Sequence, residues 1–89
     1  MTLVYLEVYV ERGCAICRRS ERLAEGVRER FPDVSVRVVD VAVEQGEHGQ
    51  LVTATPTFVL NGSVLSLGNP SRAELEAAIS RLLGGRNDR

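Results

Sequence analysis

The sequence predicts a single α/β domain built on a four-stranded mixed sheet flanked by helices. Its first half is typical of a β-α-β unit, because two runs of branched apolar residues enclose an amphipathic segment. Its second half is typical of a β-β-α unit, because an Asn-Gly turn signal joins two short apolar runs ahead of another amphipathic segment. A chain of 89 residues has room for one core only. We therefore expect one domain over residues 1–85 and a frayed tail over residues 86–89.

The first three expected elements are a strand over Leu3–Val10, a helix over Ala15–Phe31 and a strand over Val34–Val41. The first strand is apolar almost throughout, which is typical of a central strand covered on both faces. Pro32 ends the helix, since a residue before proline avoids helical backbone. A helical connection between two strands predicts that they pair in parallel through a right-handed crossover.

The remaining expected elements are a short helix or loop over Ala42–Thr55, strands over Thr57–Leu60 and Val64–Leu67, and a helix that follows Ser71 and ends at Gly84-Gly85. Asn61-Gly62-Ser63 supplies the turn between the two strands. Ser71 and Glu74 have the spacing of a capping box, in which each side chain bonds the backbone of the other.

Composition excludes several classes of protein. With 44% hydrophobic residues, 26% charged residues and a formal net charge of -1, the chain is too apolar for disorder and too balanced for electrostatic binding of nucleic acid. No stretch approaches the roughly 18 apolar residues of a membrane span. The first ten residues lack the basic region and cleavage site of a signal peptide. We expect a cytoplasmic monomer that binds neither nucleic acid nor membrane.

The chemistry of the sequence concentrates in its only two cysteines, Cys14 and Cys17, where the first strand passes into the first helix. The positive end of a helix dipole stabilises a thiolate, so we assign Cys14 as the nucleophile. Cys17, one turn further on, is expected to face the protein body as the resolving thiol. The pair therefore predicts a redox-active disulfide that exchanges with substrates, with no permanently bound cofactor and no metal.

Charged residues surround this pair. Arg12 and Arg18 are candidates for lowering the pKa of Cys14 or attracting an acidic partner, but a solvated helix face balanced by Glu21 and Glu25 is the preferred interpretation. His48, the only histidine, is interpreted as a surface residue.

Three motifs resemble the thioredoxin and glutaredoxin superfamily across roughly Leu3 to Leu83: Val8-Tyr9, Cys14-Ala15-Ile16-Cys17 and Thr55-Pro56-Thr57-Phe58. The resemblance implies a thioredoxin-like fold in which Pro56 is cis and faces the cysteines. It also implies that the Thr55 backbone pairs with a bound peptide or thiol, and that Gly68 lets substrate approach. The implied partner is a disulfide-containing protein or a small thiol, with the upstream reductase left open.

The chain also departs from its relatives at informative positions. Val8 stands where thioredoxins place a buried acid, and Glu11 stands where glutaredoxins usually have a lysine. Asn69-Pro70 replaces the acidic pair that follows the glycine in glutaredoxins. These departures disfavour glutathione as the partner, although the short length is similar to the compact glutaredoxin core.

Two other uses of the cysteine pair stay open from sequence. Two thiolates can hold Cu(I), as in copper-carrier domains with a similarly placed Cys-x-x-Cys motif. Arg12 replaces the methionine usual in those domains, and they lack a long connector such as residues 42–55. A dimer that bridges an iron-sulfur cluster through Cys14, as in some glutaredoxins, is the other alternative.

Overall fold

A computed structural model describes residues 3–84 of the chain. Its elements are β1 (Val4–Val10), α1 (Cys17–Arg30), β2 (Val34–Asp40), the 3-10 helix η1 (Gly49–Leu51), β3 (Thr57–Leu60), β4 (Ser63–Leu67) and α2 (Arg72–Gly84). This order confirms the expected β-α-β unit followed by a β-β-α unit. Gly85 and the expected tail over residues 86–89 lie outside the described residues.

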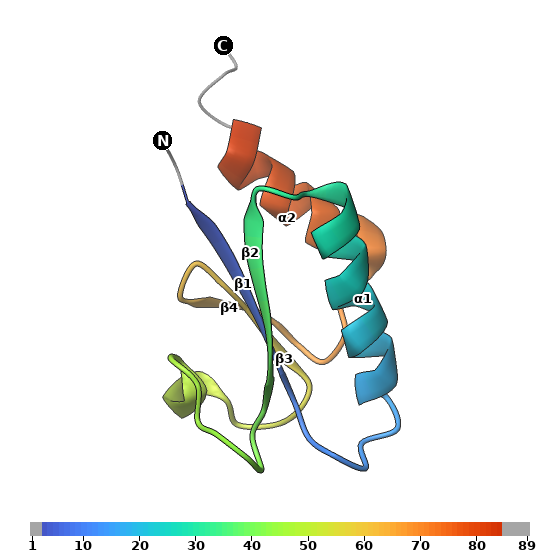
Figure 1. Cartoon of the computed structure of the whole chain (residues 1–89), viewed down its shortest axis with the longest axis vertical. Helices are drawn as coiled ribbons and strands as arrows, with labels where there is room; N and C mark the ends of the chain where they lie inside the picture. Colours follow the sequence, from blue (N-terminus) through green and yellow to red (C-terminus); the bar gives the residue numbers. More distant parts are fainter. Residues whose placement is uncertain (1–2, 85–89) are drawn as a thin grey trace.

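The four strands form one mixed sheet in the order β2-β1-β3-β4. β1 pairs in parallel with β2 and antiparallel with β3, and β3 and β4 form the antiparallel hairpin. Val8, for example, lies between Val38 on one side and Phe58 on the other. The central position expected for the first strand is therefore confirmed (Figure 1).

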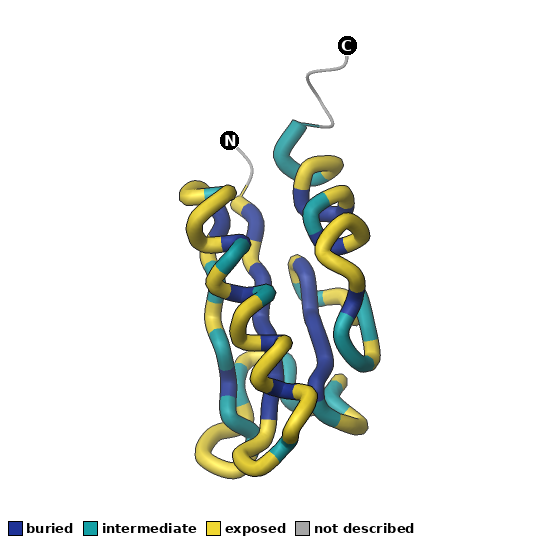
Figure 2. Tube along the Cα trace, turned by 90° about the vertical axis from the view of Figure 1, so that its right-hand side faces the viewer, coloured by how far each residue is buried: buried dark blue, intermediate teal, exposed yellow. Residues whose placement is uncertain are grey.

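Both helices pack on the same face of the sheet (Figures 1 and 2). Alternate residues of β1, from Val4 to Val10, join the helices in one apolar core that includes Val27 of α1 and Ile79 of α2. A smaller cluster of Tyr9, Val39 and Val59 lies on the opposite face, where Val41 and Val52 of the connector cover it. The sheet is thus covered by helices on one face and by an irregular segment on the other.

The first helix begins two residues later than expected. Cys14 N–H donates to the Glu11 carbonyl at 3.1 Å, and Cys17 N–H donates to the Cys14 carbonyl at 3.1 Å. These two bonds close consecutive turns before the helix. The amphipathic pattern places the last residues of these turns, from Ala15 on, in the helix itself. At the other end, Phe31 N–H donates to the Val27 carbonyl at 2.8 Å, and the helix stops before Pro32 as expected.

The connector between β2 and β3 is mostly irregular and contains only the single turn of η1. Gly46 has a φ of +73°, and a Cβ at that position would lie 2.8 Å from the Tyr9 ring. The connector can therefore close over Tyr9 only because residue 46 has no side chain. No helix within residues 3–84 has the length and apolar character needed to cross a membrane.

The capping box at the start of α2 is confirmed. Glu74 N–H donates to Ser71 Oγ at 3.0 Å, and Ser71 N–H donates to Glu74 Oε1 at 3.0 Å. Two backbone donors that lack helical partners are therefore satisfied by side chains.

We expect Ser71→Ala to lower the free energy of unfolding by about 1 kcal/mol, because the Glu74 N–H loses its acceptor. Denaturant unfolding of the oxidised protein measures this loss. Ser80→Ala is the matched control, since Ser80 is exposed on the same helix and has no capping role. Equal stabilities of the Ser71→Ala variant and the parent would contradict the prediction.

Candidate active site

The two cysteines are joined by a disulfide where β1 passes into α1. Cys14 lies in the turn before the helix, and Cys17 is the first helical residue, with their Cα atoms 5.2 Å apart. Cys17 is only 2% exposed and belongs to the core, whereas Cys14 is half-buried at the edge of that core. The expected pairing is therefore confirmed, and Cys14 is the more exposed cysteine of the two.

The later start of α1 changes how the helix acts on Cys14. Cys14 precedes the helix by three residues, so its sulfur meets the end of the helix from outside the first turn. That turn contains no acidic residue, and it carries Arg18 and Arg19, both exposed. The helix dipole presents positive charge toward the turn that holds Cys14, and Arg18 lines the same cavity as both cysteines, whereas Arg19 lines a cavity between α1 and α2.

The structure brings the flanking arginines to the cysteine pair. Arg12 and Arg18 line a cavity of about 510 Å³ together with Glu21 and both cysteines. Neither arginine forms an ion pair with another residue in the described part of the chain. Glu25, expected to balance the arginines near the cysteines, is instead bonded to Arg28 on its own helix. The positive charge beside the pair is therefore less compensated than the sequence suggested.

Two distant segments meet at the edge of β3. The Thr55-Pro56 peptide bond is cis, and Pro56 is buried. Gly68 N–H donates to the Pro56 carbonyl at 2.7 Å, which joins the residues after β4 to the proline. Gly68 has a φ of +97°, and a Cβ there would meet nothing within 4 Å, so the turn and not packing requires glycine. Thr55, Pro56 and Gly68 are thus brought together.

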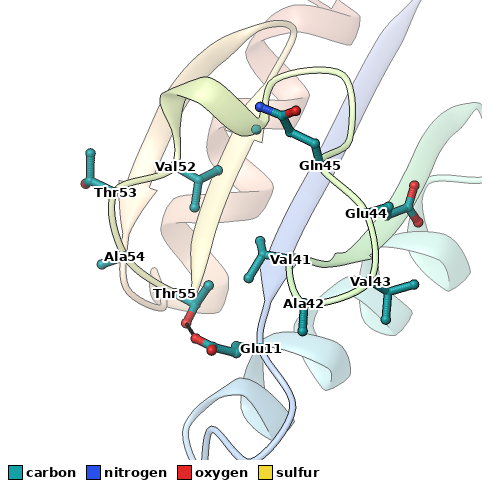
Figure 3. Close-up of a pocket in the computed structure, with 11 residues that line it drawn as sticks. Glu11, Val41, Ala42, Val43, Glu44, Gln45, Val52, Thr53, Ala54 and Thr55 are labelled. Carbon is teal, nitrogen blue, oxygen red and sulfur yellow. Dashed lines mark hydrogen bonds between the residues drawn. The ribbon is translucent and has the colours of Figure 1, made fainter.

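Glu11 connects this edge to the cysteine turn, a role that the sequence did not reveal. Thr55 Oγ1 donates to Glu11 Oε1 at 3.4 Å, while the Glu11 carbonyl accepts from Cys14 N–H. Glu11 and Thr55 also line a cavity of about 580 Å³ beneath the connector (Figure 3). Glu11 lies between two hollows, since it also lines the cavity of the cysteines.

A thioredoxin-domain family model matches residues 4–80, which covers every element that carries the site. The chain belongs to the thioredoxin family. The thioredoxin of Methanocaldococcus jannaschii is 32% identical over 90 residues, covering 93% of this chain and 100% of that relative. A probable thioredoxin of Methanothermobacter thermautotrophicus is 30% identical over 82 residues, covering 88% of this chain and 94% of the relative.

Solved thioredoxins share this fold. The crystal structure of Fasciola hepatica thioredoxin has a TM-score of 0.73 at 24% identity, covering 90% of this chain and 81% of that one. A mutant thioredoxin from Halobacterium salinarum has a TM-score of 0.75 at 25% identity, covering 89% of this chain and 74% of that one. The expected thioredoxin-like fold is confirmed, and with it a redox cysteine pair as the chemistry of the family.

In this thioredoxin-family chain, position 8, where thioredoxins place a buried acid, carries a valine. Val8 is completely buried in the core that also contains Cys17. The buried acid is Glu7, whose neighbouring position on β1 turns its side chain to the opposite face of the sheet. A carboxylate inside an apolar strand was the signal available in the sequence.

Glu7 belongs to a polar network under the connector. His48 Nδ1 lies 2.6 Å from Glu7 Oε1, and His48 N–H donates to the Tyr9 hydroxyl at 2.8 Å. His48 is therefore half-buried and structural, which corrects its interpretation as a surface residue. Glu47 brings a third possible metal ligand within 4.8 Å of these groups, but Glu7 and His48 already satisfy each other.

Burial raises the pKa of Tyr9 above its ordinary value of 10.0, a shift that the His48 N–H bond opposes and the Glu7 charge reinforces. The native state therefore holds the Tyr9 proton more tightly than the unfolded chain. Stability that depends on this proton is fully present below pH 10 and is lost as the pH rises from there through the raised pKa.

We expect the free energy of unfolding of the oxidised protein to fall above pH 10, by at most about 1.4 kcal/mol per pH unit. Denaturant unfolding between pH 8 and pH 11 measures the slope. Tyr9→Phe removes the titrating group and flattens the curve, whereas Tyr5→Phe, at an exposed site, keeps the alkaline loss. If the free energy of unfolding of Tyr9→Phe still falls above pH 10, the prediction is wrong and another group causes the loss of stability.

Proposed function

We propose that this protein is a thiol-disulfide oxidoreductase that reduces protein disulfides, with Cys14 as nucleophile and Cys17 as resolving thiol. The observation that carries the proposal is the unequal exposure of a bonded cysteine pair at the start of α1, in a chain of the thioredoxin family. An accessible first sulfur and a shielded second one suit a reaction in which only the first meets the substrate.

The reaction transfers two electrons from the dithiol to the substrate. The Cys14 thiolate attacks one sulfur of a substrate disulfide, and the other substrate sulfur leaves as a thiolate that takes up a proton. The Cys17 thiolate then attacks Cys14 Sγ, forms the Cys14–Cys17 bond and releases the second substrate thiol. A dithiol or flavin-dependent reductase has to supply two electrons for the next cycle.

Thr55 is the proposed contact for the substrate backbone. Within residues 3–84, its backbone N–H and carbonyl have no hydrogen-bond partner, although Thr57, two residues on, pairs within the sheet. An extended peptide can therefore add to this edge through main-chain bonds. Gly68, across the proline, leaves open space where a side chain would obstruct approach.

The charges at the site favour a protein over glutathione as substrate. Glu11 places a carboxylate between the Thr55 edge and the cysteines, where an anionic tripeptide would be repelled. Arg12 and Arg18 offer exposed positive charge on the helix side, so a protein partner with an acidic side chain there would gain attraction. We place the protein in the cytoplasm as a monomer, where a reducing direction follows from the low potential of that compartment.

We expect Cys14→Ser to abolish reduction of insulin disulfides, because no other cysteine exists in the chain to begin the reaction at an accessible site. We expect Cys17→Ser to accumulate a mixed disulfide between Cys14 and the substrate, because the resolving thiol is absent. Turbidity of reduced insulin and mass spectrometry of the trapped adduct measure the two results.

Ser80→Ala, with both cysteines intact and the substitution at an exposed position on α2, is a control that should retain turnover and form no adduct. Adduct formation through Cys17 in Cys14→Ser, with none in Cys17→Ser, would reverse the assignment of roles. Undiminished turnover in both cysteine variants would end the proposal. A stable stoichiometric copper complex without any exchange activity would favour the metal-carrier alternative.

We expect Glu11→Gln to speed the reaction of the reduced protein with oxidised glutathione by about threefold at low ionic strength, because one repulsive charge is removed. Stopped-flow kinetics at two salt concentrations measures the gain, which should shrink at high salt. Neutral hydroxyethyl disulfide should react at nearly the parent rate. Glu29→Gln, at the far end of α1, is the matched control, and an equal gain there would contradict a local effect.

A further inference from the structure

The first turn of α1 has weak local support. Its N-cap residue is Ile16, whose side chain makes no capping hydrogen bond. The first helical bond, from Ser20 N–H to the Ile16 carbonyl, is long at 3.4 Å. Since a helix end without a side-chain cap frays easily, the turn that begins with Cys17 needs support from elsewhere.

Asn69 supplies that support from the loop between β4 and α2. Its Nδ2 donates to the Ile16 carbonyl at 2.9 Å, and its Oδ1 accepts a hydrogen bond from Ser20 Oγ. Ser20 is completely buried, and Asn69 is half-buried. The Asn69 amide therefore binds both ends of the first helical turn, at Ile16 and at Ser20. Ile16 immediately precedes Cys17 in the chain.

The same loop is tied to the substrate edge. Gly68, next to Asn69 in the chain, donates its N–H to the Pro56 carbonyl at 2.7 Å. Ser66 Oγ donates to the Gly68 carbonyl at 2.8 Å and stiffens the loop. The consecutive residues Gly68 and Asn69 thus connect the cis-proline segment on one side with the cysteine-bearing turn on the other.

We propose that Asn69 is a positioning residue that sets the alignment of Cys17 with Cys14 and with the Thr55-Pro56 edge. This inference rests on the proposed exchange at the cysteine pair. The step that depends on it is resolution, in which Cys17 attacks Cys14 Sγ, the new S–S bond forms and the substrate leaves as a thiolate. A fixed first turn keeps Cys17 within reach of Cys14 and raises its effective concentration.

The chemistry of the amide explains why asparagine suits this position. Its NH2 group donates to a carbonyl while its oxygen accepts from a hydroxyl, so both bonds form at once. An aspartate retains the acceptor for Ser20 but has no donor for Ile16 and adds negative charge beside a carbonyl. Alanine removes both bonds. These two variants therefore separate the donor from the acceptor function of residue 69.

The first measurement is the equilibrium constant for forming the Cys14–Cys17 disulfide from the reduced pair, titrated in glutathione redox buffers. The second is the rate at which Cys17 resolves a glutathione adduct on Cys14. We expect Asn69→Ala and Asn69→Asp to lower the constant about tenfold, which corresponds to about 30 mV for two electrons. Both variants should also resolve the adduct more slowly. We expect Ser20→Ala to have a smaller effect, because the bond to the Ile16 carbonyl remains.

Asn61→Gly is the matched control. Asn61 Oδ1 accepts from Tyr5 N–H at 2.7 Å, so its side chain also bridges distant backbone, but its register on β1 is far from the cysteines. It should lose stability in denaturant unfolding while its equilibrium constant stays unchanged. If Asn69→Ala and Asn69→Asp behave in the same way, Asn69 has a purely structural role and the proposal is wrong.

Ser20→Ala keeps the proposal testable if both Asn69 variants fail to fold, since an unchanged constant and resolution rate there would overturn it. These measurements need no physiological substrate. If the parent protein equilibrates with glutathione but reduces no protein disulfide, the proposed function is refuted. The role of Asn69 is still decided in that case, because its variants are compared in glutathione buffers.

Discussion

Strand β1 buries both of its faces, and this requirement organises the domain. Its alternate residues Val4, Leu6, Val8 and Val10 need apolar cover from α1 and α2, while Tyr9 needs cover from the connector. The strand is also paired along both edges, with β2 on one side and β3 on the other. The cysteine turn follows directly after this strand, so the disulfide lies at the end of a central strand of the sheet that is largely buried.

The site itself is assembled from three segments that are distant in the chain. The turn before α1 carries Cys14, the cis-proline segment carries Thr55, and the loop after β4 carries Gly68 and Asn69. Few direct bonds join them: Thr55 to Glu11, Gly68 to Pro56, and Asn69 to Ile16. Each bond connects a different pair of segments, so together the three bonds join the segments of the site into one arrangement.

The sequence predicted much of this because the strongest signals are local. The hairpin, the capping box and the strand-to-helix junction depend on residues within a few positions of one another. The sequence does not show where α1 starts, because the amphipathic pattern continues through the preceding turn, where the bonds from Cys14 and Cys17 favour a non-helical path. The sequence does not reveal the role of His48, because its partner, Glu7, is distant in sequence and lies within an apolar strand.

The order of the elements, the central place of the first strand and the roles expected of the closely spaced cysteines can all be read from the sequence. The folded chain adds that Glu11 bridges the cysteine turn and the Thr55 edge, and that Asn69 holds the first turn of α1. The difference arises because the two kinds of interaction act over different distances along the chain. Hydrophobic period and turn chemistry act along the chain, whereas burial and long-range hydrogen bonds exist only after the strands have paired.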